Sequence, residues 1–289
     1  MHNCGQLLPD VLRHLGGDLL DHCESIAWDP SSGTAIAGGE AGQVYRIGLD
    51  GAVDEITRIS GAFLLGMTID RAGTIYACDV RGGRVHRIAP DGSAEPFGPK
   101  LPRANYPAFA ADGTLYVSQE GTHGRRDGGI VALDPSGSPA PVRLSRPLAF
   151  GNALLVEEDH LVVVESDGQC VSRVARDGGD LECVVELPGT VPDGLARDAE
   201  GGLWVSCYQP NRIYRVHGEA APDLVADDVL GWDLPMPTGI CFGGTTLSTV
   251  LVACLGGWSI ATFESTVAGK PLDHLRPTEG AQSSSIRVW

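Results

Sequence analysis

Short apolar segments alternate with turn-forming residues along almost the whole chain. Segments such as "TIYACDV", "TLYVSQ" and "LWVSCY" are rich in Val, Ile, Leu, Tyr and Trp, and Gly, Asp and Pro separate them. This pattern is typical of short β-strands joined by tight turns. A helix-like spacing of apolar residues occurs only between Leu7 and Leu20. We therefore predict an all-β fold with an N-terminal extension, residues 1–20, that has a helical pattern.

The strand pattern repeats six times. The repeats begin in register at positions 40 to 47 residues apart: Glu24, Leu65, Asn105, Asn152, Asp193 and Thr238. Each contains a short first strand, a turn with Asp or Gly, and two further strands, which is the pattern of a β-propeller blade. We predict one six-bladed β-propeller domain over residues 1–289, in which the first strand of each blade lines the central channel. The closing strand comes either from the N-terminal region or from residues 265–289.

The first position of each repeat predicts a cation site. If the six positions are equivalent, their side chains form a ring around one mouth of the channel, and four of them carry oxygen: Glu24, Asn105, Asn152 and Asp193. Two carboxylates and two amide oxygens suit Ca²⁺, Mg²⁺ or Mn²⁺. A single Asn or Asp at such a position is more often a turn former. The coincidence of four in six repeats favours a metal.

Two further groups near the ring are candidate substrate contacts. Arg103 lies two residues before Asn105 and therefore on the same side of an extended segment, where it either reaches a ligand or is simply solvated. The polar insertion "QEGTHGRRDGG", residues 119–129, contains Glu120 and His123, which could close over the site. A mobile surface loop without a function is the alternative interpretation.

Composition limits the possible partners. The chain carries 21 Lys and Arg against 37 Asp and Glu, a net charge of −16, and has no basic stripe with interleaved aromatic residues. Nucleic acids and anionic membranes are therefore not expected partners.

The eight cysteines have no C-x-x-C spacing, so we expect buried thiols. The N-terminus lacks a signal-peptide pattern, and we expect a cytoplasmic protein that acts on a small molecule. The oligomeric state is left open.

Five segments carry a resemblance to a known family. They are "CESIAWDP", "RANYPAFAADGTLYVSQ", "FGNALLVEEDHLVVVES", "VPDGLARDAEGGLWVSCY" and "MPTGICFGG", and together they extend from about Cys23 to Phe263. The chain resembles the SMP-30/gluconolactonase/luciferin-regenerating-enzyme family of six-bladed propellers. The fourth segment, which matches P-D-G-x-x-x-D-x-x-G-x-L-W-V, is the most specific.

The resemblance implies a site and a reaction. It implies a single divalent cation, often calcium or zinc, held by Glu24, Asn152 and Asp193, with Asn105 beside both substrate and metal. It also implies lactone hydrolysis with Asp193 as general base and Arg103 binding substrate hydroxyls. The sequence departs from the family pattern around three of these residues, where "ESI", "NYP" and "GNA" stand. These departures predict a substrate other than gluconolactone.

The leading hypothesis is metal-assisted hydrolysis of a sugar lactone or related cyclic ester, with Ca²⁺ favoured over Zn²⁺, Mn²⁺ or Mg²⁺. No G-x-S-x-G elbow is present, so a covalent serine mechanism is disfavoured. Alternatives on the same fold are a metal-dependent isomerase or cyclase, a phosphoesterase, and a binding platform whose cation only joins the blades.

Overall fold

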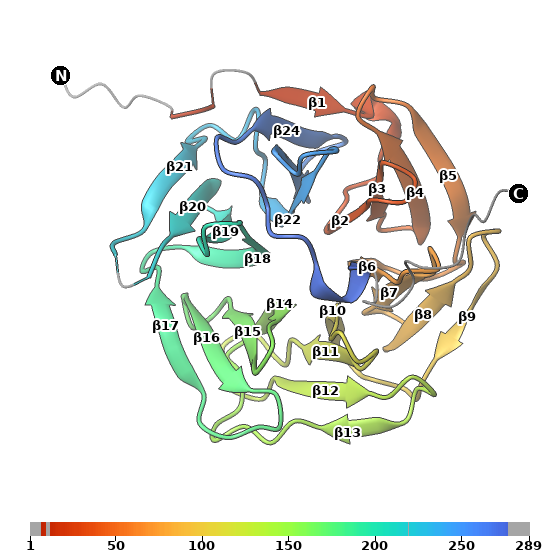
Figure 1. Ribbon diagram of the computed structural model, residues 1–289, viewed down its shortest axis with the longest axis vertical. Helices are drawn as coiled ribbons and strands as arrows, with labels where there is room; N and C mark the ends of the chain where they lie inside the picture. Colours follow the sequence, from red (N-terminus) through yellow and green to blue (C-terminus); the bar gives the residue numbers. More distant parts are fainter. Residues whose placement is uncertain (1–6, 10–11, 219, 277–289) are drawn as a thin grey trace, which may run out of the picture.

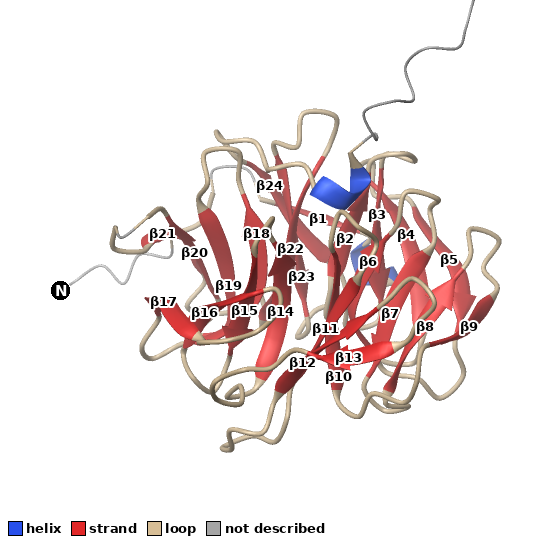
Figure 2. Cartoon of the chain, turned by 60° about the horizontal axis from the view of Figure 1, so that its bottom comes forward, coloured by secondary structure: helices blue, strands red, loops and turns tan. Residues whose placement is uncertain are grey.

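The strands form six four-stranded antiparallel sheets around a central channel (Figure 1). This computed structural model describes residues 7–9, 12–218 and 220–276. Seen from the side, the described chain is almost entirely strand and loop, with short helical turns (Figure 2). The predicted all-β, six-bladed propeller is confirmed.

The blades are numbered in the order of their innermost strands. Blade 1 contains β2 (Ile26–Asp29), β3 (Thr34–Gly38), β4 (Gln43–Gly48) and β5 (Val53–Arg58). Blade 2 contains β6 (Leu64–Ile69), β7 (Ile75–Asp79), β8 (Arg84–Ile88) and β9 (Ala94–Phe97). Blade 3 contains β10 (Ala104–Phe109), β11 (Leu115–Gln119), β12 (Gly129–Leu133) and β13 (Pro139–Pro141).

The other three blades have the same order. Blade 4 contains β14 (Gly151–Val156), β15 (His160–Glu165), β16 (Cys170–Ala175) and β17 (Glu182–Glu186). Blade 5 contains β18 (Val191–Arg197), β19 (Leu203–Gln209), β20 (Arg212–Val216) and β21 (Asp223–Asp227). Blade 6 contains β22 (Pro237–Gly243), β23 (Thr249–Cys254), β24 (Ile260–Glu264) and β1 (Arg13–Leu15). Two 3₁₀ turns, η1 (Gly17–Leu19) and η2 (Asp273–Leu275), complete the elements.

Blade 6 is closed by the N-terminal strand β1, which pairs antiparallel with β24. The helical interpretation of the segment from Leu7 to Leu20 is therefore wrong where the structure describes it. Leu7 forms an isolated bridge with Asp227, and only the η1 turn is helical. The closing strand comes from the N-terminal region, because residues 265–276 contain η2 but no strand, and residues 277–289 lie outside the described residues.

The core lies between the blades, because each blade packs its face against the next. Second strands such as β7 and β23 are buried along their whole length, as expected for strands covered on both faces. Between blades 1 and 6, for example, Trp28 and Tyr45 pack with Leu251 and Ile260. Leu15 of the closing strand joins the same cluster, so closure also extends the core.

A segment after β24 crosses one end of the channel. This C-terminal strap, residues 268–276, is anchored to blade 5, where the Lys270 N–H donates to the Arg197 carbonyl at 2.8 Å. It then crosses the middle of the propeller toward β6 and β10 (Figure 1), where His274 Nε2 lies 3.0 Å from the Ile69 carbonyl oxygen. In the described part of the chain, no helix has the length and apolar character needed to cross a membrane.

Candidate functional site

The four predicted oxygen-bearing residues lie at the end of the channel opposite the strap, near the starts of the innermost strands. Asn105, Asn152 and Asp193 each occupy a point where the pairing register of β10, β14 or β18 shifts. Such shifts mark β-bulges, which redirect side chains and occur frequently beside active sites. Glu24 lies two residues before β2. We call this end of the channel, around these four residues, the acidic mouth.

Serines at the ends of the second strands, Ser118 in β11 and Ser166 directly after β15, connect the bulges of neighbouring blades. Ser118 Oγ accepts from the Tyr106 N–H at 3.1 Å and donates to the Asn152 carbonyl at 2.7 Å. Ser166 Oγ likewise donates to the Pro192 carbonyl, beside Asp193, at 2.7 Å. Each serine is buried, so these bonds are shielded from water and fix the bulged backbones relative to one another. The sequence offers no specific signal for this role.

Two small side-chain networks organise the acidic mouth. The Asn152 amide nitrogen, Nδ2, donates to Asp193 Oδ2 at 2.9 Å. The Asn105 Nδ2 donates to Glu120 Oε2 at 3.2 Å, and Arg103 Nη1 donates to Glu120 Oε1 at 3.0 Å. Arg103, Asn105 and Glu120 therefore lie together, as do Asn152 and Asp193.

Burial makes the carboxylates of the acidic mouth difficult to ionise. Burial raises the pKa of Asp193 to about 7; the Asn152 hydrogen bond lowers it and the Glu120 charge raises it further. Burial also raises the pKa of Glu24 well above its usual range, and the charges of Asp193, Glu120 and Glu40 add to this effect. Like charges in a buried space disfavour one another's ionisation. A positive charge among them would relieve this cost.

Tyr208 lies close enough to the acidic mouth to feel its charges, and no local sequence pattern marks it. It lies near the end of β19, whose register shifts opposite Pro192. Burial raises the pKa of its phenol, and so do the charges of Glu24 and Asp193. The phenol is therefore within electrostatic range of both carboxylates.

The 119–129 insertion divides into two parts. Glu120 reaches the acidic mouth, as described above, whereas His123 stacks on the Phe150 ring with centroids 3.8 Å apart. His123 Nδ1 also lies 3.2 Å from Asp167 Oδ1, and the Gly124 N–H donates to Asp167 Oδ2 at 2.7 Å. These contacts attach the insertion to blade 4. The structure does not bring His123 into contact with the four oxygen-bearing residues.

The orientation of the two amides fits a hard cation. Because both Nδ2 atoms donate to carboxylates, each amide oxygen is directed away from its acidic partner. Asn105 Oδ1 is buried and has no hydrogen-bond partner, a costly state for a carbonyl oxygen unless something binds it. Within the described residues, no group of three or more His, Cys, Asp or Glu side chains is arranged to hold a metal ion. The donor set here is instead mixed, with two carboxylates and two amides.

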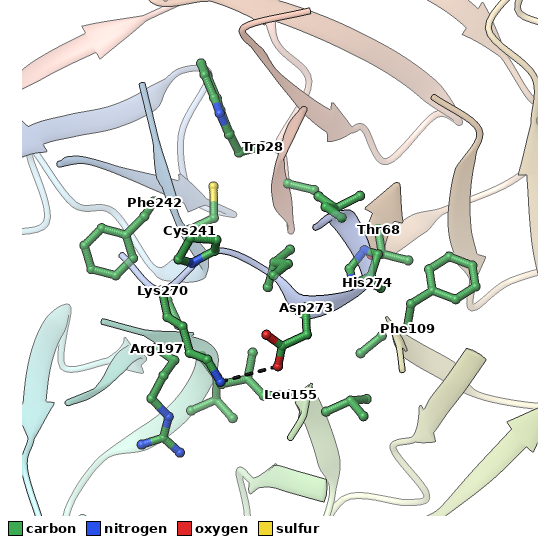
Figure 3. Close-up of a pocket in the computed structure, with 18 of the residues that line it drawn as sticks. Trp28, Thr68, Phe109, Leu155, Arg197, Cys241, Phe242, Lys270, Asp273 and His274 are labelled. Atoms are coloured by element: carbon green, nitrogen blue, oxygen red, sulfur yellow. Dashed lines mark hydrogen bonds and ion pairs between the residues drawn. The ribbon is translucent and has the colours of Figure 1, made fainter. Parts of the chain in front are cut away.

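The opposite end of the channel has different chemistry. A cavity of about 460 Å³ lies there beneath the strap, lined mainly by apolar side chains from the ends of the innermost strands, including Trp28, Phe109, Leu155 and Phe242 (Figure 3). Its charged groups lie in or near the strap, where Lys270 Nζ is 3.4 Å from Asp273 Oδ2. This cavity contains none of the predicted site residues.

Comparison with known proteins identifies relatives. Residues 93–255, more than half of the chain, match the model of the SMP-30/Gluconolactonase/LRE-like region. Regucalcin of Bos taurus is 36% identical over 70 residues, 24% of this chain and 22% of that protein. The match thus spans about a fifth of the length of that relative.

Solved structures share the fold over most of the chain. A calcium-binding protein, regucalcin, from Agrobacterium tumefaciens has a TM-score of 0.74 and 16% identity, covering 92% of this chain and 97% of that one. A gluconolactonase from Xanthomonas campestris has a TM-score of 0.71 and 17% identity, covering 93% and 96%. These identities support a common fold only. The extent of the family match is what shows that this chain belongs to the SMP-30/Gluconolactonase/LRE-like family.

Proposed function

We propose that the protein is a metal-dependent hydrolase of lactones, with its active site in the acidic mouth. In this proposal Glu24, Asn105, Asn152 and Asp193 hold one divalent cation, most simply Ca²⁺. The observation that carries the proposal is the buried, unpartnered Asn105 Oδ1 beside carboxylates whose ionisation is suppressed by burial. A similar fold in a gluconolactonase and in a calcium-binding regucalcin supports the reaction class and the cation.

A bound cation would supply Lewis-acid polarisation of the lactone carbonyl. The protein's own side chains transfer the proton and orient the substrate. Asp193 accepts the Asn152 bond on Oδ2, so Oδ1 is the oxygen that takes the proton from the attacking water. Without a cation, burial raises the pKa of Asp193 to about 7, and a bound cation would favour the ionised form that accepts a proton.

Arg103 and Glu120 orient the substrate in this proposal. The Arg103 side chain is half exposed and its guanidinium is fixed at one end by Glu120, which leaves other N–H groups to meet a lactone or the carboxylate formed from it. Glu120 in turn fixes the Asn105 amide. The pair therefore couples substrate position to the orientation of a proposed cation ligand.

The test measures both cation binding and turnover. Protein stripped with a chelator is expected to open no lactone, and turnover of a panel of sugar and alkyl lactones, followed by acid release, is expected to return with Ca²⁺. Isothermal titration calorimetry is expected to show one Ca²⁺ site, weakened at least about tenfold in Glu24→Gln, because even outer-shell changes cost that much in metal sites. The exposed Asp177 provides a matched control, and Asp177→Asn is expected to bind Ca²⁺ normally.

Two results would contradict the proposal. Full turnover by stripped protein would remove the cation from the reaction. A bound cation without hydrolysis of any lactone on the panel would remove the reaction and leave a cation-binding propeller.

A further inference from the structure

Four non-glycine residues around the acidic mouth have left-handed backbones at equivalent positions. Each lies two residues before the first residue of a sequence repeat, in blades 1, 3, 4 and 6. They are His22 (φ 43°), Arg103 (φ 58°), Phe150 (φ 60°) and Met236 (φ 55°). Residues with such angles are uncommon outside glycine and cost free energy. Their recurrence at one register position indicates that the mouth requires side chains there, since strained residues cluster at ligand sites.

Arg103 indicates where this backbone conformation directs a side chain. Its guanidinium donates to Glu120 Oε1, and the other oxygen of Glu120 accepts from Asn105 of the ring. The side chain two residues before the ring thus reaches over the acidic mouth. His22 and Phe150 have the same left-handed backbone at the same position in their blades, so we place them on the same rim.

Two of these rim residues contact rings from the preceding blade. The His22 ring lies 4.0 Å from the Trp258 ring, measured between centroids, and is tilted by 42°, whereas the Phe150 ring is stacked on the His123 ring at 3.8 Å with an interplanar angle of 12°. Trp258 lies in the hairpin between β23 and β24, and His123 lies in the corresponding hairpin between β11 and β12. The two ring pairs therefore come from corresponding positions, although one is tilted and the other stacked. They stand on opposite sides of the channel, because blades 1 and 4 are three blades apart in a ring of six.

The two ring pairs present accessible aromatic surfaces. Trp258 is 49% exposed although His22 contacts it, and Phe150 is partly exposed. Met236 extends the Trp258 side of the rim, because it packs against Gly256 of the same hairpin, where a built Cβ would lie 3.3 Å from its sulfur. Exposed aromatic faces beside a polar reaction centre are suited to stack on a flat apolar group.

Polar groups beside the ring pairs are already bonded to one another. Asp167 accepts from the Gly124 N–H and contacts His123, and both Glu120 oxygens accept from Arg103 and Asn105. A site that selects a polyhydroxylated sugar needs donors and acceptors available for its hydroxyls. Among the described residues of this rim, Trp258, Phe150 and His123 offer exposed aromatic faces, whereas Arg103 keeps N–H donors available.

From this arrangement we propose that the enzyme selects lactones bearing an aromatic substituent, which stacks on the His22–Trp258 or His123–Phe150 pair while the lactone ring lies over the acidic mouth. This substrate class rests on the proposed lactonase function. The proposal assigns a binding role to four aromatic side chains that lie outside the set of oxygen-bearing residues.

The test compares lactones that differ only in the aromatic group. With Ca²⁺ restored, β-phenyl-γ-butyrolactone is expected to have a kcat/KM at least about tenfold above that of γ-butyrolactone, and also above that of glucono-δ-lactone. A stacking contact and the burial of one ring together justify an effect of this size. The first two compounds share the ring and the type of leaving group, so their ratio reports binding of the phenyl group.

Variants then locate the contact. Trp258→Ala removes one ring pair, and Phe150→Asn removes the other while keeping a residue that tolerates the left-handed backbone. Each is expected to lower the phenyl-to-unsubstituted ratio severalfold, mainly through KM, and the double variant is expected to bring it close to one. Leu224, 38% exposed on the outer strand β21, is the control. Leu224→Ala is expected to keep the parental ratio, and thermal unfolding checks that all variants fold.

The outcomes separate this proposal from the one on which it rests. If unsubstituted and sugar lactones are opened but the phenyl ratio is near one, or if the ratio survives loss of both ring pairs, the aromatic selection is overturned and the lactonase function stands. If no lactone is opened with any cation, both proposals are overturned.

Discussion

The two ends of the channel are built from the same six innermost strands, yet they differ in backbone geometry and in the chemistry of their side chains. At the acidic mouth the strands contain bulges, four flanking non-glycine residues have left-handed backbones, and carboxylates are buried. At the strap end the innermost strands of blades 2 to 6 pair in regular register and the lining is mostly apolar, although Leu247 in that lining also has a left-handed backbone (φ 55°). The register shifts of the innermost strands in these blades are thus concentrated at the end where the chemistry is proposed.

The difference between the two ends has a physical origin. Glycines directly after the first residue of a repeat let neighbouring innermost strands approach closely at the acidic mouth. A Cβ on Gly66 would lie 2.6 Å from the Asn105 carbonyl oxygen, and one on Gly239 would lie 2.7 Å from the Ser25 Cα. The backbones therefore crowd side chains toward the axis at this level. At the other end larger side chains separate the strands, and the strap covers the remaining space.

The largest effect expected is on catalysis. Asp193→Asn keeps the size of the side chain but removes the proposed base, so we expect kcat to fall by about 10³-fold, within the range for loss of general base catalysis. The stripped variant should be no less stable than stripped wild type, because the charge it removes is costly to bury. Steady-state hydrolysis and thermal unfolding measure the two effects. Retention of most activity would exclude Asp193 as the base.

The next effect tests the support behind the acidic mouth. Glu165 is completely buried and accepts from Arg146 at 2.6 and 2.7 Å, from Arg126 at 3.2 Å and from Ser172 at 2.5 Å. Glu165→Gln leaves these donors with an uncharged partner, so we expect the free energy of unfolding to fall by about 3 kcal/mol, the lower end for breaking a buried pair. Denaturant unfolding measures it, and a loss below 1 kcal/mol would contradict this role.

The pKa of Glu165 makes the free energy of unfolding depend on pH. Burial opposes its ionisation, but the bonds from Arg146 and Ser172 prevail and lower the pKa of Glu165 from 4.5 to about 2. The unfolded chain therefore binds the proton more tightly, and this stabilisation is complete above about pH 4.5 and is lost as the pH falls through 2. The difference between wild type and Glu165→Gln is expected to be constant from pH 7 to 5 and to shrink toward pH 3. A difference that grows on acidification would refute the assignment.

How far the sequence predicts this molecule depends on the range of the interaction. The repeat, the blade count and the ring of Glu24, Asn105, Asn152 and Asp193 follow from in-register spacing, because equivalent positions in a propeller share one level of the channel. The β1 strand could not be recognised in this way, since Arg13–Leu15 is only three residues long and its partner β24 lies far along the chain. Local apolar spacing there predicts a helix, whereas the described residues of this segment contain β1 and the short η1 turn.

The candidate site shows the same limit. The polar insertion makes Glu120 a candidate from sequence, but its bond to Asn105 is visible only in the structure. The same insertion makes His123 a candidate, whereas its stack on Phe150 depends on how blades 3 and 4 meet. Tyr208 carries no local signal at all, because only the fold places it beside Glu24 and Asp193.

A smaller effect is expected at the strap end. A methyl group on Gly269 would overlap the Phe242 side chain, so Gly269→Ala forces the strap away from blade 6. We expect a loss of about 1–3 kcal/mol in the free energy of unfolding, the usual cost of overpacking. Lactone hydrolysis is expected to change less than about twofold, which would preserve the separation of the two ends. A larger fall in kcat with an intact fold would show that the ends are coupled.

The smallest effect expected is at the ion pair on the strap itself. Lys270 Nζ lies 3.4 Å from Asp273 Oδ2, and both side chains are more than a third exposed, so water and salt screen their attraction. Lys270→Gln keeps most of the aliphatic stem and the main-chain bond to Arg197. We expect the unfolding free energy to change by less than about 0.5 kcal/mol, and the change to vanish in 1 M salt. Because apolar contacts and main-chain bonds hold the strap, a loss of several kcal/mol would mean that this end of the channel, like the acidic mouth, depends on charge.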